Sequence, residues 1–399
     1  MSSPEFDAIV VGGGPAGMMT GLLFARAGCR VLVLEKHPDF FHDFRGDTVH
    51  PSTMEILDQL GMLGRFLKRP HHKLHKAQFR LAGRVWTIGD LSRLRVVAPY
   101  AAIMPQWDFL DFVRSEAQAF SGFNLAMKSP VEGYVEEGGR VVGVRLADGR
   151  ELRARLVIAA DGRHSIVRRV LPLQSLAVPI DVFWFNVPHD DIGGEALLGS
   201  IERERILIMI DRGDHWQCAL IISKGSAEEL MAGGIEPIRQ AIHTTAPGLD
   251  LSSLRVDDLA LLSVTIDRLT KWSKPGLLAI GDAAHAMSPV GGIGINLAIQ
   301  DAVAAANALA GPLARGDDVD RLLHKIQRRR LFPTRVVQFM QRLGQDKVFA
   351  PVLLPGAPIT EVPWLVKLID RHPVLQGIPA HFVGLGVRRE RVRSPNAYA

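Results

Sequence analysis

The sequence predicts an α/β fold with an inserted antiparallel sheet, and three observations lead to that prediction. Two short apolar runs, residues 7–11 and 30–35, flank a glycine-rich turn and a helix-like stretch near the start of the 399-residue chain. Two later apolar runs, residues 156–160 and 276–280, each end in a turn made of Asp and Gly. Between these runs, long segments alternate apolar and polar residues, which is typical of strands buried on one face. A β-α-β unit and a separate antiparallel sheet are therefore expected.

The turn between the first two strands has the spacing of a phosphate-binding loop. Gly12, Gly14 and Gly17 form G-x-G-x-x-G. In such a loop the first glycine permits the tight turn, the second lets the backbone approach a diphosphate, and the third brings helix and strand together. The diphosphate would lie against free N–H groups at the start of a helix expected over residues 17–28.

Glu35 ends the second strand and narrows the choice of nucleotide. A carboxylate at this place accepts hydrogen bonds from ribose hydroxyls and repels a 2′-phosphate. The unit therefore predicts FAD or NAD rather than NADP, and by itself it does not decide between the two. A glycine-rich turn without a ligand is the alternative.

The later segments decide between FAD and NAD. Asp161 and Gly162 form the second turn, and a helix carrying Ser165, Arg168 and Arg169 is expected after it. The third segment, GDAAH…P-x-G-G-x-G-x-N, runs over residues 281–296. With the glycine loop and Glu35, in this order and at this spacing, they resemble class A flavoprotein monooxygenases, the para-hydroxybenzoate hydroxylase-like family. The resemblance covers residues 7 to about 313. It implies a Rossmann-like (GR2-type) FAD-binding domain, with NADH or NADPH as co-substrate.

The resemblance also implies contacts with each part of FAD. Asp282 would bind the ribityl hydroxyls or the diphosphate, and Gly292 would let its loop pass close to the isoalloxazine. A helix beginning near Gly294 would point its N-terminus at the reduced flavin. Pro289 would line the side that reacts with oxygen. The implied FAD contacts are Gly12, Gly14, Pro15, Ala16, Gly17, Glu35, Lys36, Arg45, Gln106, Asp161, Gly281, Asp282, Pro289, Gly292, Gly294, Ile295 and Asn296.

Several of these positions have a second interpretation. Asp161 either contacts FAD or only holds its turn, and Asp282 could instead cap a helix. Arg45 lies where the family places an arginine against the FAD phosphates, but it could be an ordinary surface arginine. Gln106 opens a helix at a position where arginine is also common in the family. His285 is expected to be a structural hydrogen-bonding residue rather than a catalytic one.

The scattered motifs require an FAD domain assembled from separate segments. The predicted division is 1–73, 98–178 and 270–315 for the FAD domain, 74–97 and 179–269 for the substrate domain, and 316–399 for a C-terminal helical region and tail. The substrate domain would be an antiparallel sheet over the flavin, with one helix at residues 226–246. The C-terminal region would be helical from residue 318, kinked at Pro333, and would end in a Pro-rich tail.

The implied reaction is hydroxylation or epoxidation of an aromatic or other apolar small molecule, using NAD(P)H and O₂ through a flavin C4a-hydroperoxide. Arg205, Met209 and Trp216 are candidate substrate contacts, and His215 and Gln217 are weaker ones. No catalytic acid or base can be assigned. The alternatives are an FAD-dependent dehydrogenase or oxidase, a halogenase or prenyl reductase, and a non-catalytic flavin-binding module. The W-x-W-x-I-P segment of halogenases is not found in the sequence.

Composition bounds the remaining possibilities. The net charge of +5 comes partly from basic clusters at residues 325–330 and 388–393. Neither cluster lies in a nucleic-acid-binding motif, so solvated faces are expected, with steering of anionic cofactors as the alternative. Cys29 and Cys218 are expected to be buried thiols. With neither a signal peptide nor an apolar run of eighteen residues, the sequence predicts a cytoplasmic monomer or homodimer without integral membrane association. No metal site is expected.

Overall fold

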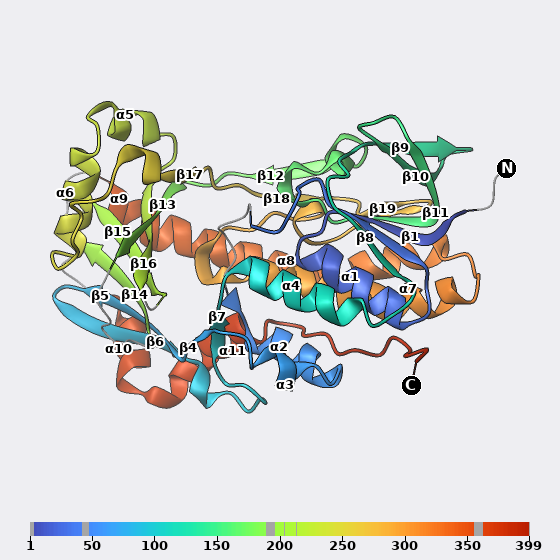
Figure 1. Cartoon of the computed structure of the whole chain (residues 1–399). Coiled ribbons are helices and arrows are strands. Elements are labelled where there is room, and N and C mark those ends of the chain that lie inside the picture. Colours follow the sequence, from blue (N-terminus) through green and yellow to red (C-terminus); the bar gives the residue numbers. More distant parts are fainter. Residues whose placement is uncertain are drawn as a thin grey trace.

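Two large sheets lie at opposite ends of the molecule, with long helices running between them (Figure 1). The computed structural model describes residues 4–41, 48–188, 196–202, 204–212, 214–354 and 362–398. A two-stranded antiparallel ribbon, β12 (Leu173–Leu176) with β18 (Ile266–Leu269), connects the two halves. The fold is thus a mixture of sheets and helices, and the chain passes between the two halves more than once.

The first sheet has the strand order β19-β20-β11-β1-β2-β8. Its five strands from β20 to β8 are parallel, and β19 is antiparallel to β20. The bounds are β1 Phe6–Val11, β2 Val31–Leu34, β8 Phe123–Ala126, β11 Glu151–Ala159, β19 Ser273–Lys274 and β20 Leu277–Ala279. Because β1 lies between β2 and β11, all three turns identified in the sequence open at one edge of this sheet.

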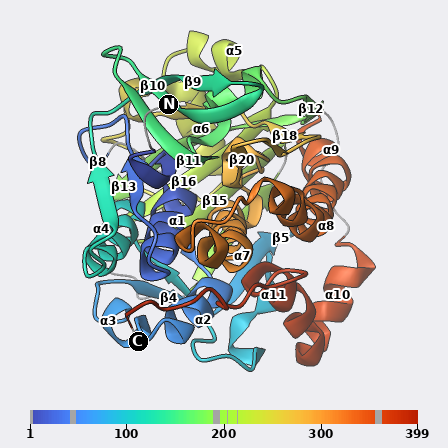
Figure 2. The ribbon, with the colours of Figure 1, turned by 90° about the vertical axis from the view of Figure 1, so that its right-hand side faces the viewer.

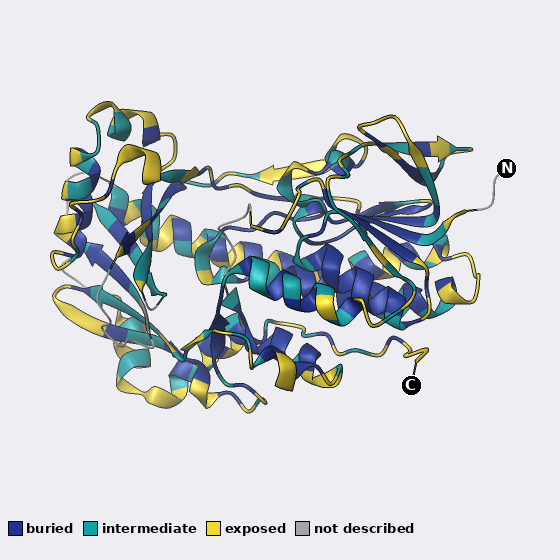
Figure 3. Cartoon of the chain, in the orientation of Figure 1, coloured by how far each residue is buried: buried dark blue, intermediate teal, exposed yellow. Residues whose placement is uncertain are grey.

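Helices cover one face of the first sheet. They are α1 Pro15–Arg26, α4 Gln106–Ala117, α7 Gly294–Ala314 and α8 Asp320–Gly344. Figure 2 shows α1 with α4 on one side and α7 on the other. Small residues permit this packing, since a Cβ on Gly21 of α1 would lie 2.6 Å from Val33 Cγ2 on β2. The result is the largest apolar core of the chain (Figure 3).

The opposite face of the first sheet is covered by an antiparallel hairpin. It consists of β9 (Val131–Glu137) and β10 (Arg140–Leu146), and β10 pairs with the first part of β11. Val141 and Val144 of the hairpin pack with alternate residues of β1 and β11 in a second core. The sheet is therefore buried on both faces, which explains why its strands are almost continuously apolar.

The second sheet has the order β17-β13-β16-β15-β14-β5-β6. All neighbours are antiparallel except β14 and β5, which are parallel. The bounds are β5 Lys76–Leu81, β6 Arg84–Asp90, β13 Ile180–Pro188, β14 Ala196–Glu202, β15 Arg205–Asp211, β16 His215–Ser223 and β17 Ala260–Leu262. The prediction of a wholly antiparallel sheet was wrong at this one junction, where two segments distant in the chain meet.

The remaining elements are short. A small sheet has the order β3-β7-β4. The strands of this sheet and the other helices are β3 Thr48–Val49, β4 His72–Leu74, β7 Ala101–Ile103, α2 Pro51–Gln59, α3 Leu63–Phe66, α5 Ala227–Ala232, α6 Glu236–Thr245, α9 Ala350–Leu353, α10 Trp364–Arg371 and α11 Gly377–Gly384. Beyond α11 the chain runs back along the first half, past α2 and α7, to the C-terminus (Figures 1 and 2).

Three predicted elements differ from the structure. The single helix expected at 226–246 is two helices, α5 and α6, because Gly234 adopts a positive φ of 74° between them. The turn at Asp161 and Gly162 leads into 3₁₀ turns, Gly162–His164 and Ile166–Arg169, instead of an α-helix. The predicted Pro-rich tail contains two helices. α10 begins directly after Pro363, and α11 begins between Pro373 and Pro379.

The structure also describes the two cysteines and the apolar character of one long buried helix. Cys29 and Cys218 are free and buried, as predicted. Among the described residues one segment, Val290–Ala314, is long and apolar enough to cross a membrane. That segment contains α7, and 78% of its apolar window is buried inside the protein.

Candidate functional site

The glycine loop between β1 and α1 has the geometry that a diphosphate requires. Gly12 has a φ of +103°, and a Cβ there would lie 2.5 Å from the carbonyl oxygen of Ala160 on the neighbouring chain segment. A Cβ on Gly17 would collide with the carbonyl oxygen of Gly12. A Cβ on Gly14 would meet nothing within 4 Å, and no side chain caps α1. The N-terminus of α1 therefore faces open space in front of Gly14.

Glu35 lies beside this loop, one residue after β2 ends. One carboxylate oxygen accepts a hydrogen bond from Gly13 N at 2.7 Å, and the other accepts one from His37 N at 3.0 Å. The residue is only 6% exposed. Each oxygen keeps a further lone pair, so the held carboxylate can still accept a ribose hydroxyl.

The third motif contacts the first. Gly281 begins a 3₁₀ turn, Gly281–Ala283, with a φ of +57°. A Cβ on Gly281 would lie 3.1 Å from the Cβ of Ala16 in α1 and equally close to that of Ala298 in α7. The absence of a side chain at Gly281 thus lets the first turns of α1 and α7 converge on one loop.

The second motif contacts the third through arginines. Arg168 donates to both carboxylate oxygens of Asp267 at 2.8 Å and to the carbonyl oxygen of Asp282 at 2.7 Å. Arg163 lies 3.6 Å from the Asp282 carboxylate. Burial raises the pKa of Asp282, and Arg163 partly opposes this. The Asp282 side chain is nevertheless 32% exposed, and its Oδ1 would be 4.0 Å from a Cβ on Gly294, at the start of α7.

Asp161 holds its own turn. Its carboxylate accepts hydrogen bonds from the Ser165 hydroxyl and from Ile166 N. Burial raises the pKa of Asp161, and these two hydrogen bonds act in the opposite direction. Both carboxylate oxygens thus accept hydrogen bonds inside the loop, which is the geometry of a residue that holds its own turn.

The loop before α7 is shaped by glycines. Pro289 precedes a 3₁₀ turn, Val290–Gly292, in which Gly291 and Gly292 both have positive φ, 83° and 60°. A Cβ on Gly292 would lie 3.3 Å from Thr48 Oγ1. Burial lowers the pKa of the neighbouring His50 to about 4, so this ring is neutral near pH 7. The loop therefore follows a path that side chains would obstruct, and it ends at the N-terminus of α7.

Asn296 anchors this loop to α2. Its Oδ1 accepts hydrogen bonds from His50 N at 2.9 Å and from Thr53 Oγ1 at 2.7 Å. Its Nδ2 donates to the carbonyl oxygens of Thr48 and Gly292. The side chain is 2% exposed. Any contact of Asn296 with a flavin would therefore involve its backbone at the helix start.

A buried ionic network lies behind the third motif. Asp301 Oδ2 accepts hydrogen bonds from His285 Nε2 at 2.6 Å and from Gly281 N at 3.1 Å, and its Oδ1 accepts one from Arg330 Nε at 2.8 Å. All three side chains are at most 1% exposed. Burial acts to raise the pKa of Asp301, but His285 and Arg330 hold it below its usual range. His285 therefore has the structural role expected for it.

The remaining predicted FAD contacts differ in how far they are buried. Gln106 is buried at the first position of α4, as expected for a residue that opens a helix. Lys36 is exposed, and Ile295 is half-buried in the first turn of α7. Arg45 lies outside the described residues.

The substrate candidates lie on β15 and β16. Met209 and Trp216 pack in the core between the second sheet and helices α5 and α6. Arg205 donates to the carbonyl oxygen of Glu204 at one end of β15. Figure 1 shows α5 and α6 at the outer end of the molecule. Met209 and Trp216, which pack toward these helices, therefore lie on the face of the sheet turned away from the first sheet. His215 contacts Asp214, and Gln217 contacts Arg212.

The residues present fit FAD, judged by their own geometry. The open space before α1 suits a diphosphate, and the uncapped helix start supplies N–H donors there. Gly281 lies against Ala16 of α1 and Ala298 of α7, and Asp282 faces Gly294, so the starts of the two helices lie close to one loop. No group of three or more His, Cys, Asp or Glu side chains in the described part of the chain is arranged to hold a metal ion.

Comparison with known proteins agrees with this geometry. The FAD-binding domain family, described as "FAD binding domain", matches residues 5–340. The chain is 32% identical over 410 residues to 6-methylpretetramide 4-monooxygenase of Streptomyces rimosus, covering 97% of this chain and 94% of that protein. The chain belongs to the FAD-binding family of flavin-dependent monooxygenases. It is accordingly an FAD-dependent oxidoreductase.

Other relatives are more distant. Rifampicin monooxygenase of Streptomyces venezuelae is 29% identical over 74% of this chain and 62% of its own length. Among solved structures, PqsL, a probable FAD-dependent monooxygenase of Pseudomonas aeruginosa, matches with a TM-score of 0.75 at 22% identity, over 87% of this chain and 99% of its own. The p-nitrophenol 4-monooxygenase PnpA of Pseudomonas putida matches with the same TM-score at 20% identity, over 95% and 97%. At these identities the structures support the fold alone.

Sequence reasoning missed two groups of residues at the site. Asp301 and Arg330 form the buried pair, and one signal was available for it, namely the single carboxylate in an alanine-rich helix. Thr48, His50 and Thr53 contact the Gly292 and Asn296 region from a segment that carries no glycine motif. Nothing local in the sequence pointed to these three.

Proposed function

We propose that this enzyme hydroxylates a phenolic, polycyclic aromatic small molecule, using NADH or NADPH and O₂. The observation that carries the proposal is the 32% identity, over nearly the whole of both chains, to a monooxygenase named for a pretetramide. Further relatives are named for aklavinone, tetracycline intermediates and para-nitrophenol. What these names share is a hydroxylated or nitrated aromatic ring.

Our proposed division of the chain into domains is the one that the sequence predicts. The first sheet, with α1, α4 and α7, forms a GR2-type Rossmann-like domain from residues 1–73, 98–178 and 270–315. The second sheet, from residues 74–97 and 179–269, forms the substrate domain. The parallel order of β2, β1, β11 and β20 and the two strands of the connecting ribbon support this division.

The residues proposed to hold FAD act by position and charge. The N–H groups at the start of α1 would bind the diphosphate, and Glu35 would accept the adenosine ribose hydroxyls. The N-terminus of α7 would face the pyrimidine edge of the flavin, where its dipole stabilises negative charge. Arg163 would balance Asp282 nearby. When bound, FAD supplies hydride acceptance and oxygen activation.

The proposed substrate surface is the face of the second sheet opposite α5 and α6. On this face Trp184, Ile208 and Ile210 are half-buried, and Trp184 and Ile208 share an apolar cluster with residues of α9. Leu207 and Met209 on the other face are buried. Figure 1 supports an inward orientation, since α5 and α6 lie at the far end from the first sheet. An apolar wall there would hold an aromatic substrate and exclude water from the reacting centre. Met209 and Trp216 are therefore less suitable than these three.

The test uses the purified, FAD-loaded protein. We expect polycyclic phenols to stimulate NAD(P)H oxidation and labelled O₂ to enter the product. Substrate oxidation without NAD(P)H would instead indicate an oxidase, and product without labelled oxygen a dehydrogenase. The absence of turnover with every phenol tried would contradict the proposal.

A matched pair of variants tests the proposed surface. Ile210→Trp adds bulk to the inward face and should raise KM for the phenol about tenfold while FAD content stays unchanged. Leu261→Trp adds the same bulk at a 47% exposed position on β17 and should leave KM unchanged. Equal KM values in the two variants would contradict the placement of the substrate.

A further inference from the structure

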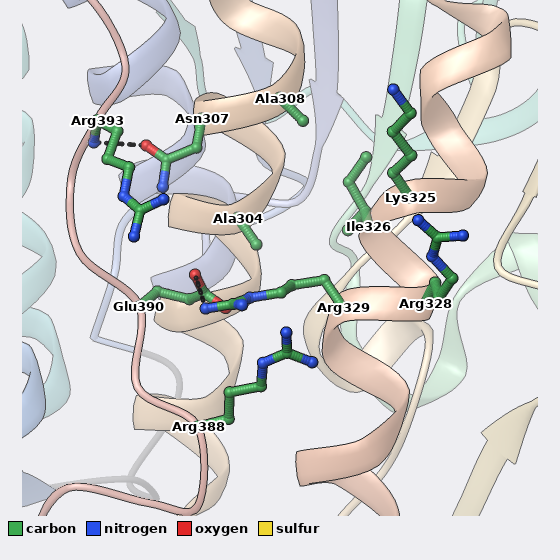
Figure 4. A pocket seen from close by; sticks show the side chains of 10 residues that line it. All are labelled: Ala304, Asn307, Ala308, Lys325, Ile326, Arg328, Arg329, Arg388, Glu390 and Arg393. Atoms are coloured by element: carbon green, nitrogen blue, oxygen red, sulfur yellow. Dashed lines mark hydrogen bonds and ion pairs between the residues drawn. The ribbon is translucent and has the colours of Figure 1, made fainter.

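A strongly basic hollow lies outside the FAD site, between α7, α8 and the C-terminal tail (Figure 4). Its volume is about 400 Å³. Its charged lining is Lys325, Arg328, Arg329, Arg388, Arg393 and Glu390. Five cationic side chains thus line the hollow together with one carboxylate.

The single carboxylate is already neutralised. Glu390 accepts a hydrogen bond from Arg329 Nε at 2.7 Å and lies 3.4 Å from Nη1 of the buried Arg330. Lys325, Arg328, Arg388 and Arg393 have no ion pair with any carboxylate in the described part of the chain, and all four are exposed. The hollow therefore carries uncompensated positive charge.

The tail is fixed so that its arginines stay over the hollow. Asn307 of α7 accepts a hydrogen bond from Arg393 N at 2.6 Å and donates one to the carbonyl oxygen of Arg391 at 2.8 Å. Arg330 donates to the carbonyl oxygen of Arg388 at 3.0 Å. Placing like charges together costs free energy, and here hydrogen bonds of the tail backbone keep them together.

The hollow is separate from the flavin end of α7. That helix begins at Gly294, and Ala304 and Asn307 of the hollow lie three to four turns further along it. At 1.5 Å per residue this separation is about 15–20 Å. The proposed FAD contacts do not use any of the side chains that line the hollow.

We propose that this hollow binds a small anion carrying two or more closely spaced phosphate groups. Guanidinium groups pair with phosphate oxygens through two parallel hydrogen bonds, and three arginines with a lysine can serve several oxygens at once. The volume is within the range of small-ligand sites. None of the described side chains that line it is aromatic, so a nucleobase would find no stacking surface.

Closely spaced phosphate groups have two sources, the diphosphate bridge of NADH or NADPH and a free diphosphate or polyphosphate. The chemistry is the same for both. The site itself does not depend on the proposed hydroxylation, so the two can fail separately.

The experiment measures pyrophosphate binding to the FAD-loaded full chain by calorimetry, at about 20 and about 150 mM salt. We expect saturable 1:1 binding that weakens about tenfold or more in an Arg388→Gln, Arg393→Gln double variant. Arg321→Gln with Arg335→Gln is the control, since it removes two exposed arginines of α8 that do not line the hollow. Arg329, Arg330 and Glu390 are left intact because they belong to the buried network.

The outcomes separate clearly. Equal weakening in both double variants would show general attraction to a basic protein and overturn the proposal, as would the absence of saturable binding. If pyrophosphate raises the KM for NADH or NADPH, and the Arg388, Arg393 variant loses this effect, the site takes the diphosphate of the cofactor. If pyrophosphate binds without altering either KM, the site takes a free phosphate compound.

Discussion

Gly281 and Ala16 are in contact although 265 positions separate them in the chain. A Cβ on Gly281 would lie 3.1 Å from the Cβ of Ala16, closer than ordinary van der Waals contact. Ala16 belongs to the glycine loop that starts α1, and Gly281 to the turn that follows β20. This contact joins two halves of a nucleotide site that the sequence presents at opposite ends.

Gly281→Ala should damage both stability and FAD binding. The residue has a φ of +57°, which costs a side-chain-bearing residue about 1–2 kcal/mol. The new methyl group would also press on Ala16 and Ala298. We expect the free energy of unfolding to fall by about 1–3 kcal/mol and the FAD dissociation constant to rise. Chemical denaturation and fluorescence titration measure the two effects.

A second substitution tests whether crowding against Ala16 matters. Adding Ala16→Gly to Gly281→Ala removes one of the two colliding methyl groups, so part of the FAD affinity should return. If the double variant binds FAD no better than Gly281→Ala, the contact with Ala16 is unimportant, and backbone strain with crowding against Ala298 explains the loss. Gly64→Ala serves as a control, because a Cβ there meets nothing within 4 Å.

Asp301→Asn should destabilise the protein strongly. The change removes the charge that faces both His285 and the fully buried Arg330. Breaking such a buried pair costs about 3–5 kcal/mol, because the remaining guanidinium is left without its main counter-charge. Urea unfolding at pH 7 measures this. A loss below about 1 kcal/mol would mean that Glu390 alone suffices for Arg330.

The same pair predicts a pH dependence in acid. The pKa of Asp301 is held below its usual value of 3.8 in the folded protein. Its contribution is therefore fully present above that value and is lost as the pH falls through the lower, folded-state pKa. The stability difference between wild type and Asp301→Asn should be constant from pH 7 to about 5 and shrink below about 4. A difference that shrinks already between pH 7 and 5 would contradict this assignment.

For His50 we predict that stability changes in a different pH range. Burial lowers its pKa from 6.5 to about 4, partly opposed by the backbone of Gly292 and Val383. Folding therefore favours the neutral ring, and stability is full above pH 6.5 and falls between 6.5 and 4. The loss relative to His50→Gln should approach about 3 kcal/mol near pH 4. If the free energy of unfolding depends on pH in the same way in both proteins between pH 6.5 and 4, the pKa of His50 is not lowered by folding, which would contradict this prediction.

Elements with local signals could be predicted from the sequence. β1, α1 and β2 lie where apolar runs and glycines place them, and α7 begins at Gly294 as expected. These positions are determined by backbone sterics, since only glycine permits the conformation at Gly12 and the close approach at Gly17. The family could be inferred because three such signals occur in one order.

Features that depend on distant partners could not be predicted. Asp301 meets Arg330 across 29 residues, and Asp267 meets Arg168 across 99. In neither pair does the sequence spacing between the two residues indicate that they meet. The parallel pairing of β14 with β5 likewise depends on how two segments meet in space. Helices α10 and α11 were hidden because their flanking prolines are also typical of an irregular tail.

We infer that the loop before α1 receives the FAD diphosphate, and the Gly14→Asp variant is the sharpest test of this claim. Gly14 has an ordinary extended conformation, with φ −71° and ψ −176°, and a Cβ there meets nothing. Aspartate at this N-cap should stabilise the FAD-free protein by up to about 1 kcal/mol. The same carboxylate would occupy the diphosphate space and repel its charge.

The measurement is the amount of FAD retained per chain after purification, read from the visible absorption spectrum, with thermal unfolding of the FAD-free proteins alongside. We predict that Gly14→Asp loses FAD while its FAD-free form unfolds at or above the wild-type temperature. Full retention of FAD by a folded Gly14→Asp protein would contradict the claim.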